Sequence, residues 1–382
     1  MRVLVASDQH YLLPFAWRLK REGVDVEVLV FKDKFEAAWE GMFDKALTGR
    51  DKKKENLELV ATLAKEGEMI VVTDSARGVK AFPEGVVYPK LPSTSGPRGP
   101  LAIGSWFDGR DFNHSLDHLV VNDWGTWPGG VGPLALGGVT LARESTILHP
   151  EMDKLVDLLR AKGFRGLVSA QALVTDVGWT LGVVDFGWPF IHSDAFISDL
   201  SSLGDLLFGN HATLDAKYVV TIPVTIPPWP IPAKEVKARE VVVNGLGAED
   251  TKNIFFRDFK RGEEFEIQTV GLDGFICVVR GSADTLELAR ARAIGVASKI
   301  QVPEKQYRPD VGLRAGVMLG GLLESSFFNP VELSPLASID LNPVLGEEVV
   351  NDPVQNMSTS GNGPGSLTEL ATGDPITTLS EV

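Results

Sequence analysis

Short apolar runs alternate with helix-like segments over the first 75 residues of the chain. The apolar runs stand at residues 2–6, 24–30 and 69–73. Runs of this length, separated by helical segments, are typical of buried strands in a parallel sheet. The intervening segments predict helices at residues 12–22, 33–48 and 54–66. Together they predict a small Rossmann-like domain over residues 1–95.

Proline and glycine become dense between Pro83 and Pro100, which marks a connector and places a domain boundary near residue 95. The central region, residues 96–212, contains a glycine-rich loop at Asn122–Gly132. A helix is predicted after it at residues 150–162, and two strands follow at residues 166–174 and 181–186, joined by a turn at Asp176–Gly178.

Five prolines between residues 223 and 232 predict an extended crossing segment, because proline excludes a helix and is disfavoured in a central strand. The third region, residues 213–325, then predicts strands at residues 254–259, 264–270 and 275–280. A helix with one apolar face follows, with Asp284 as its N-cap and Glu287 three residues later, as in a capping box.

The remaining residues, 326–382, form an extension. From Gly346 onward it is rich in Asn, Ser, Thr, Gly and Pro without periodicity, so the tail is predicted to be disordered. The predicted fold class is α/β with α+β.

Composition adds limits to this picture. The chain has 382 residues, of which 44% are hydrophobic and 23% charged, as expected of a soluble protein with two or three domains. The apolar run from Gly312 to Leu323 contains Arg314 and is shorter than the roughly 20 residues that span a membrane. The N-terminus enters a strand directly, so we expect a cytoplasmic protein without membrane contact.

The net charge of −14 repels polyanions, which argues against nucleic acid as a partner. A single cysteine, Cys277, lies in an apolar run and is expected to be a buried packing residue.

The hexapeptide Tyr307-Arg308-Pro309-Asp310-Val311-Gly312 resembles the closing Tyr-Arg-x-Asp-Ile-Gly pattern of the phosphoribosylamine–glycine ligase family. The resemblance extends, unevenly, over most of residues 1–315, and Arg308 is expected to pair with Asp310. It implies a Rossmann-like first domain, a reduced ATP-grasp-like central domain and a small β-rich third domain. It also implies ATP-dependent amide formation between glycine and an amine, as in purine biosynthesis, with ATP and Mg²⁺ as cofactors.

A second match covers the centre of the chain. Asp117-His118 and the loop with Gly129, Gly130 and Gly132 resemble the family's Gln-Asp-His-Lys-Arg segment and Asn-Thr-Gly-Gly-Met-Gly loop. The resemblance implies a catalytic role for Asp117 and His118 and substrate contact by the three glycines, whose backbone N–H groups can approach an anion closely. Leu119 and Val120 stand where the family has Lys and Arg.

A third match is Val183-Val184-Asp185-Phe186, which resembles the family's Ile-Glu-Phe-Asn strand. The resemblance implies that Asp185, together with Asp194, holds Mg²⁺, which prefers oxygen ligands. The chain departs from the family where Gly187 replaces Asn and Pro189 replaces Arg. The family also inserts a β-rich subdomain that clamps ATP. The Pro/Gly connector that stands in its place is only about 15 residues long, which is the length of a loop, so we expect this subdomain to be absent.

Several alternatives stay open. His114 and His118, four apart, would suit a metal only on a helix, whereas Asn113 and Gly109 predict a loop there. The tryptophans Trp124, Trp127, Trp179 and Trp188 either fill a core or, for the first two and the last, line a reshaped pocket.

Three functions follow from the sequence. The first is a divergent ligase that acts on small molecules. The second is a pseudoenzyme or binding module without ATP chemistry, needing no cofactor. The third is an interaction role in which the tail recruits a protein partner. The sequence leaves the oligomeric state open.

Overall fold

The computed structural model describes residues 2–324 except for 9–10, 32–37, 39, 44–45, 48–53, 75–85, 89–92, 94–98, 131–135, 143–151, 154, 176–177, 189–191, 231–237 and 263–265. The chain divides into two units, residues 1–350 and 351–382, and every described residue belongs to the first. Gly132, Pro189, most of the Pro83–Pro100 connector, Asp176 and the tail from Gly346 lie outside the described residues.

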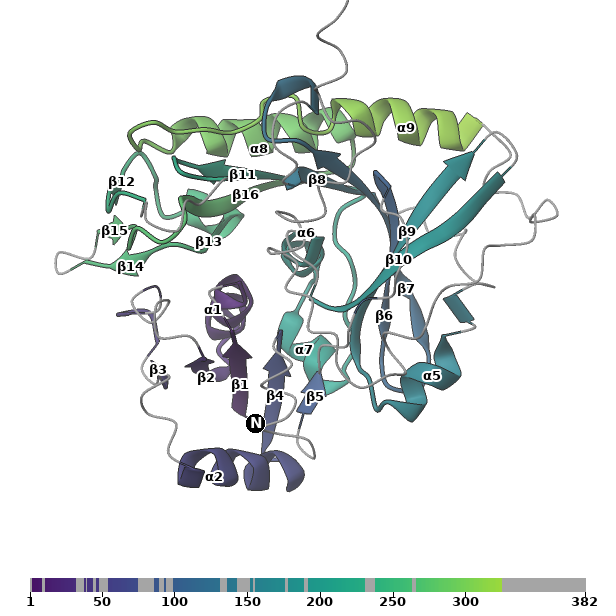
Figure 1. Ribbon diagram of the computed structural model, residues 1–382, viewed down its shortest axis with the longest axis vertical. Coiled ribbons are helices and arrows are strands. Elements are labelled where there is room, and N and C mark those ends of the chain that lie inside the picture. The colour runs from purple at the N-terminus through teal and green to yellow at the C-terminus, as the bar shows by residue number, and fades with distance from the viewer. Residues whose placement is uncertain are drawn as a thin grey trace, which may run out of the picture. The chain divides into compact units, whose positions relative to one another are not determined.

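The N-terminal part of the chain forms a parallel sheet of five strands in the order β3-β2-β1-β4-β5 (Figure 1). The strands are β1 (Arg2–Ser7), β2 (Asp25–Val30), β3 (Ala46–Leu47), β4 (Met69–Thr73) and β5 (Val86–Tyr88). The helices are α1 (Leu13–Arg21) and α2 (Lys54–Lys65). Both helices and the three predicted strands are therefore confirmed.

The helix predicted at residues 33–48 is wrong at its end, where β3 pairs in parallel with Val28 and Leu29 of β2. The backbone edge of β2 offers hydrogen bonds there, and this tertiary pairing outweighs the local helical preference.

The centre of the fold is an eight-stranded sheet whose neighbouring strands are all antiparallel. Its order is β10-β9-β6-β7-β8-β11-β16-β13. The strands are β6 (Leu101–Phe107), β7 (Phe112–Trp124), β8 (Leu136–Ala142), β9 (Gly166–Thr175), β10 (Gly178–Gly187), β11 (Tyr218–Thr225), β13 (Ile254–Phe256) and β16 (Phe275–Ala283). The predicted strands at residues 166–174, 181–186 and 275–280 are confirmed. The sheet runs without interruption across residue 212, and the predicted division into domains stays a prediction.

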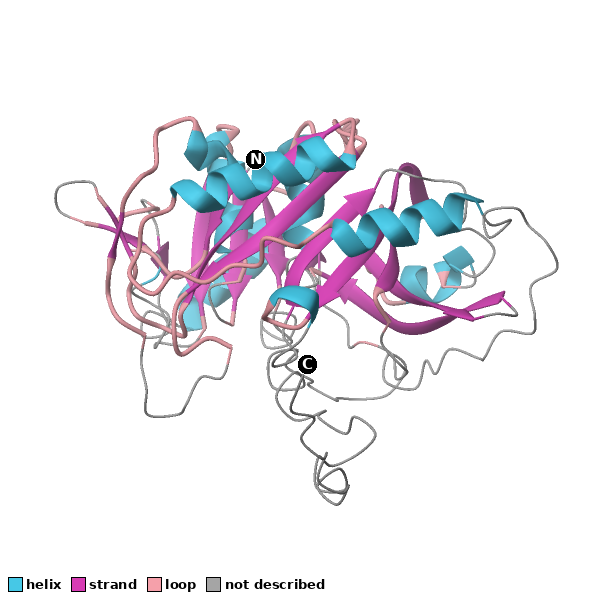
Figure 2. Cartoon of the chain, turned by 90° about the horizontal axis from the view of Figure 1, so that it is seen from above, coloured by secondary structure: helices cyan, strands magenta, loops and turns pink. Residues whose placement is uncertain are grey.

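The two faces of the large sheet carry different helices (Figure 1). On one face, an apolar core packs against α5 (Val156–Ala161), which lies within the predicted helix at 150–162, and α9 (Leu313–Glu324). On the other face lies α6 (His192–Asp199). The next helix, α7 (Leu203–Phe208), contacts Glu22 at the end of α1 and Tyr88 of β5. Figure 2 shows the helices in cyan over the magenta strands from a second direction. The face under α6 carries the polar side chains described below.

Pro223 lies inside β11, a central strand, so the prediction that residues 223–232 avoid such a strand is wrong at its start. β11 pairs with β16 from Tyr218 to Thr225 but with β8 only from Tyr218 to Thr221. Pro223 therefore lies past the end of the β8 pairing, where its missing N–H removes no hydrogen bond to β8.

A small antiparallel sheet adds β12 (Val242–Val243), β15 (Ile267–Gln268) and β14 (Lys260–Arg261), in that order. The strand predicted at 264–270 is thus limited to β15 among the described residues. The helix α8 (Leu286–Lys299) is confirmed, but its N-cap is Thr285, whose side chain accepts from Leu288 N, and not Asp284. Cys277 is buried, as expected. None of the helices in the described ranges is both long and apolar enough to cross a membrane.

Helix α8 packs directly onto β16 at Gly281. A Cβ atom at Gly281 would lie 2.1 Å from Ala289 O and 2.4 Å from Ala293 N, and both are helix backbone atoms. Ala289 and Ala293 are fully buried in the same contact. Only a residue without a side chain allows the helix to approach this closely.

We therefore expect Gly281→Ala to lower the free energy of unfolding by about 2–3 kcal/mol, because the added methyl forces the helix away from the sheet. Gly295→Ala, on α8, is the matched control, since no atom lies within 4 Å of the position of its added Cβ atom. It should raise stability by about 1 kcal/mol through helix propensity. Urea unfolding of both variants measures this, and equal effects would contradict the close packing.

Candidate functional site

A row of polar side chains crosses four neighbouring strands of the large sheet. Asp185 of β10 pairs with Ser169 of β9, Ser169 pairs with Gly104 of β6, and Gly104 pairs with His118 of β7. Directly opposed residues in antiparallel strands point to the same face. Asp185, Ser169 and His118 therefore share the face that α6 covers.

Gly104 provides the space that His118 needs. A Cβ atom at Gly104 would lie 2.1 Å from His118 Nε2. The imidazole of His118 thus lies across β6, where it also stacks on Phe196 of α6 at a centroid distance of 5.2 Å. Any other residue at position 104 would displace this ring.

Four groups form one buried chain of hydrogen bonds. His118 Nδ1 lies 2.8 Å from Leu116 O, His118 Nε2 lies 2.7 Å from His192 Nε2, and His192 Nδ1 lies 3.1 Å from Ser169 Oγ. Burial lowers the pKa of His118 to about 4. Burial, and then the neighbouring His118, lower the pKa of His192 well below its usual value. Both rings are therefore neutral at pH 7.

The neutral state fixes every proton in this chain. Leu116 O can only accept, so His118 Nδ1 carries the proton and His118 Nε2 accepts. His192 Nε2 must then donate, and its Nδ1 accepts from the hydroxyl of Ser169. The Ser169 proton is consequently directed at His192.

Asp117, predicted to act with His118, makes its contacts elsewhere. Its carboxylate accepts from Ser105 Oγ and lies 3.0 Å from His114 Nδ1. Ser105 pairs with Val168, which belongs to the apolar core on the opposite face of the sheet. Asp117 and His118 therefore lie on opposite faces of the sheet. The catalytic role of each stays a prediction.

The segment around His114 belongs to β7 and is not the predicted loop. The register between β6 and β7 shifts in this segment. Gly104 pairs with His118, whereas Trp106, two residues later, pairs with Asn113. Four residues of β7 thus face Ser105 alone, and the hydrogen bond from Ser105 to Asp117 stabilises this bulge.

Asp194, one of the two predicted magnesium ligands, forms a buried ion pair. Its carboxylate accepts from Arg257 Nη2, and the two side chains are 3% and 2% exposed. Burial raises the pKa of Asp194 and the Arg257 guanidinium opposes that rise. The charge of Asp194 is thus already balanced by a buried guanidinium of the same chain.

Asp185, the other predicted ligand, accepts a 2.6 Å hydrogen bond from Ser93 Oγ. Within the described part of the chain, no three His, Cys, Asp or Glu side chains gather closely enough to hold a metal. The two carboxylates do not fit a shared magnesium site in this arrangement, and their metal role stays a prediction.

The glycine-rich loop is held by the Tyr307–Gly312 hexapeptide. Arg308 donates to Trp124 O at 3.1 Å and to Gly125 O at 3.0 Å, and it pairs with Asp310 as predicted. Asp310 Oδ2 accepts from Gly129 N at 2.7 Å. Gly129 N is therefore already bound within the protein, and substrate contact by Gly129 and Gly130 stays a prediction.

Trp188 and Trp127 differ in solvent exposure. Trp188 is 9% exposed and packs on Phe15 and Trp106, with ring centroids 4.5 and 5.9 Å away, so it fills the core. Trp127 is 58% exposed.

Sequence reasoning missed Ser169, Gln171, Gly104 and the chain through His192. The available signal was period two: Ser169 and Gln171 are polar residues two apart in an apolar strand, and both are buried. Their partners come from other strands and from α6, which the sequence does not bring together.

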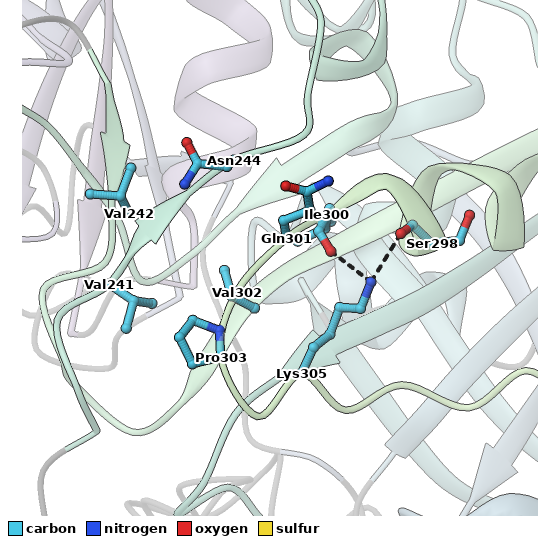
Figure 3. A pocket seen from close by; sticks show the side chains of 9 residues that line it. All are labelled: Val241, Val242, Asn244, Ser298, Ile300, Gln301, Val302, Pro303 and Lys305. Carbon is cyan, nitrogen blue, oxygen red and sulfur yellow. Dashed lines mark hydrogen bonds between the residues drawn. The ribbon is translucent and has the colours of Figure 1, made fainter.

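A pocket of about 670 Å³ lies beside β12 of the small antiparallel sheet (Figure 3). It lies between Val241–Asn244 and the segment after α8, and it shares no residue with the polar row. Its Lys305 Nζ donates to Ser298 O at 3.1 Å and Ile300 O at 2.6 Å (Figure 3). This lysine caps the C-terminus of α8, where the helix dipole is negative.

No family model and no curated protein matches the sequence. Among solved structures, phosphoribosylamine–glycine ligase from Thermotoga maritima is 13% identical, and the alignment covers 81% of this chain and 100% of that one with a TM-score of 0.54. Urea carboxylase from Kluyveromyces lactis is 7% identical, covering 87% of this chain and 32% of that one, with a TM-score of 0.50. At such identities the likeness concerns the fold, and the chain has an ATP-grasp-like fold.

The two buried histidines predict a pH dependence of stability. Because the folded-state pKa of His118 is about 4 and the unfolded value 6.5, the unfolded chain binds the proton first as pH falls. The contribution of His118 is complete above pH 6.5 and is lost between 6.5 and 4, by about 3 kcal/mol in total. The free energy of unfolding, measured in urea at each pH, should fall less steeply with decreasing pH in His118→Gln than in the wild-type protein. The exposed His211→Gln is the control, and an unchanged slope in His118→Gln would contradict a neutral ring.

The Asp194–Arg257 pair makes a separate prediction. Arg257→Met should cost about 3–5 kcal/mol, because it leaves a buried carboxylate without its cation. The double variant with Asp194→Asn should recover more than half of that loss. Lys252→Met, which breaks an exposed pair with Glu249, should change stability by less than about 1 kcal/mol. Equal stabilities of the single and double Arg257 variants in urea unfolding would refute the coupling.

Proposed function

We propose that this protein is an ATP-dependent ligase of the ATP-grasp kind that joins a carboxyl group to an amine. The fold supports this, since the chain aligns over the full length of a phosphoribosylamine–glycine ligase structure. The observation that carries the proposal is the polar row under α6. Buried polar groups cost free energy unless they are satisfied or used, and this row of buried polar groups lies on the sheet face that α6 covers.

The finer proposal is that the acid is glycine or a similar amino acid and that the reaction belongs to purine biosynthesis in the cytoplasm. The Tyr307–Gly312 hexapeptide, with its Arg308–Asp310 pair, supports this choice. Leu119 and Gly187 replace charged or polar residues of the family, so the substrates need not be identical.

ATP would supply the phosphoryl group that activates the carboxylate. Asp185, half-buried at the end of the polar row, is the residue that would face its magnesium ion. Asp194 does not fit that role while Arg257 holds it.

A second candidate is a binding module that keeps the fold without ATP chemistry. The Asp194–Arg257 pair favours it, because one of the two expected metal ligands serves the protein's own packing. A role for the tail in recruiting a protein partner remains a separate proposal.

Binding of Mg-ATP tests the ligase. At a concentration 100-fold above its Kd, a bound nucleotide stabilises the folded state by about 2.7 kcal/mol, which raises the melting temperature by several degrees. Asp185→Asn should then lower ATP hydrolysis coupled to glycine and an amine by about 100-fold, which corresponds to about 2.7 kcal/mol. Asp157→Asn, whose side chain is 96% exposed, is the control.

Two results separate the candidates. No thermal shift at millimolar Mg-ATP rejects the ligase and leaves the binding module. A shift with unchanged turnover in Asp185→Asn removes Asp185 from the site and keeps the nucleotide.

A further inference from the structure

Helix α9 carries apolar side chains on two opposite faces. Ala315 and Leu319 are buried in the core over the large sheet, at 0% and 5% exposure. Leu313 and Val317 lie four residues apart, so they share the other face of the helix, where they are 56% and 79% exposed. Among the large apolar side chains of the described residues, Val317 has the largest exposed fraction.

The outer face of α9 also carries a positive charge. Arg314 is exposed beside Leu313, and we call Leu313, Arg314 and Val317 the α9 surface. A Cβ atom at Gly316 would lie 3.5 Å from Leu286 Cδ2 of α8, so α8 borders the α9 surface without covering it. An exposed apolar stripe with a cation beside it suits an apolar segment that carries acidic side chains.

The chain that directly follows α9 is rich in apolar side chains. Helix α9 ends at Glu324, and residues 325–345 lie outside the described residues. The charged side chains of this segment are two acids, Glu332 and Asp340. Large apolar side chains recur along it at Phe327, Phe328, Val331, Leu333, Leu336, Ile339, Leu341, Val344 and Leu345. A segment of this composition gains free energy when it buries apolar surface, unlike the polar tail from Gly346.

The segment reaches the α9 surface without a long linker. Val317 lies seven residues before the end of α9, which is about 10 Å along the helix axis. An extended chain covers about 3.3 Å per residue, so Phe327 and Phe328 lie at this reach from Glu324. A short tether gives a local concentration in the millimolar range. A contact with a Kd of about 0.1 mM would therefore be closed roughly ten times as often as open.

We propose that residues 325–345 fold back onto the α9 surface and pack Phe327 and Phe328 against Leu313 and Val317. The contact lies within one chain, so it needs neither a second copy nor a partner protein. It goes beyond the proposed function, because it holds for a ligase and for a binding module alike. It leaves the residues after 345 as the part of the extension that could recruit a partner.

Thiol labelling of the full chain with N-ethylmaleimide tests the contact. Cys277 is buried and should stay unreactive, so an introduced cysteine reports alone. Val317 is 79% exposed and Leu59 of α2 is 57% exposed, so an uncovered Val317→Cys should react at least as fast as Leu59→Cys. We expect the thiol of Val317→Cys to react about tenfold more slowly. Equal or faster labelling of Val317→Cys would overturn the proposal.

Replacing the two phenylalanines identifies the segment that covers the surface. In the Val317→Cys background, Phe327→Ser with Phe328→Ser should speed labelling by about tenfold, because the apolar contact is lost. Leu367→Ser with Leu370→Ser, in the tail, is the matched control and should leave labelling slow. Melting temperatures of all variants separate a lost contact from a lost fold. Labelling that stays slow without the two phenylalanines would overturn the assignment.

A second copy of the chain could cover the same surface, so labelling is repeated over a range of protein concentrations. A contact within one chain gives a rate that does not depend on concentration. Labelling that speeds up on dilution would overturn the proposal and assign the α9 surface to a second copy, which Val317→Glu should then release in sedimentation velocity. These measurements use no nucleotide, so their outcome is independent of the Mg-ATP test.

Discussion

The buried guanidinium of Arg257 is the interaction on which the arrangement of the first unit depends. Arg257, at the end of β13, binds the Asp194 carboxylate on α6 and donates to Tyr11 O, just before α1, at 2.8 Å. Three segments that lie up to 246 residues apart thus meet at one side chain. Water is excluded there, so breaking any of these contacts exposes a charge to a medium of low dielectric constant. This contact ties α6 to the residue that directly follows β13 of the large sheet.

Helix α6 in turn completes the polar row. His192, two residues before Asp194, reaches His118 and Ser169, so the ion pair and the hydrogen-bond chain begin on the same turn of the helix. Gly104 provides room below and Phe196 covers the His118 ring from above. Asp194, a predicted metal ligand, is thus ion-paired two residues along α6 from the neutral histidine pair.

Local sequence patterns correctly predicted those strands and helices whose structure follows from their own residues. Apolar runs gave β1, β2, β4, β9 and β16, and the spacing of Ala289, Ala293 and Val296 gave α8, because burial of one face follows a fixed period. Predictions failed where a distant partner decided. β3 exists because β2 offers an edge, and Pro223 is tolerated in β11 because the pairing of β11 with β8 ends at Thr221. The bulge at His114–Asp117 depends on Ser105 of the neighbouring strand.

The sequence by itself determined β1, β2, β4, β9, β10 and β16, the helices α1, α2 and α8, and the Arg308–Asp310 pair. Arg308 and Asp310 are so close in the chain that they meet without help from the rest of the fold. The sequence also named Asp117, His118 and Asp185 as candidate site residues, but it missed Ser169, Gly104 and His192. Only the tertiary structure decided which of these residues meet. It placed Asp117 and His118 in different environments, tied Asp194 to Arg257, and aligned Asp185 and Ser169 with Gly104 and His118 across four strands. The physical reason is that strand register and helix docking join residues far apart in sequence, and neither is encoded in any local pattern.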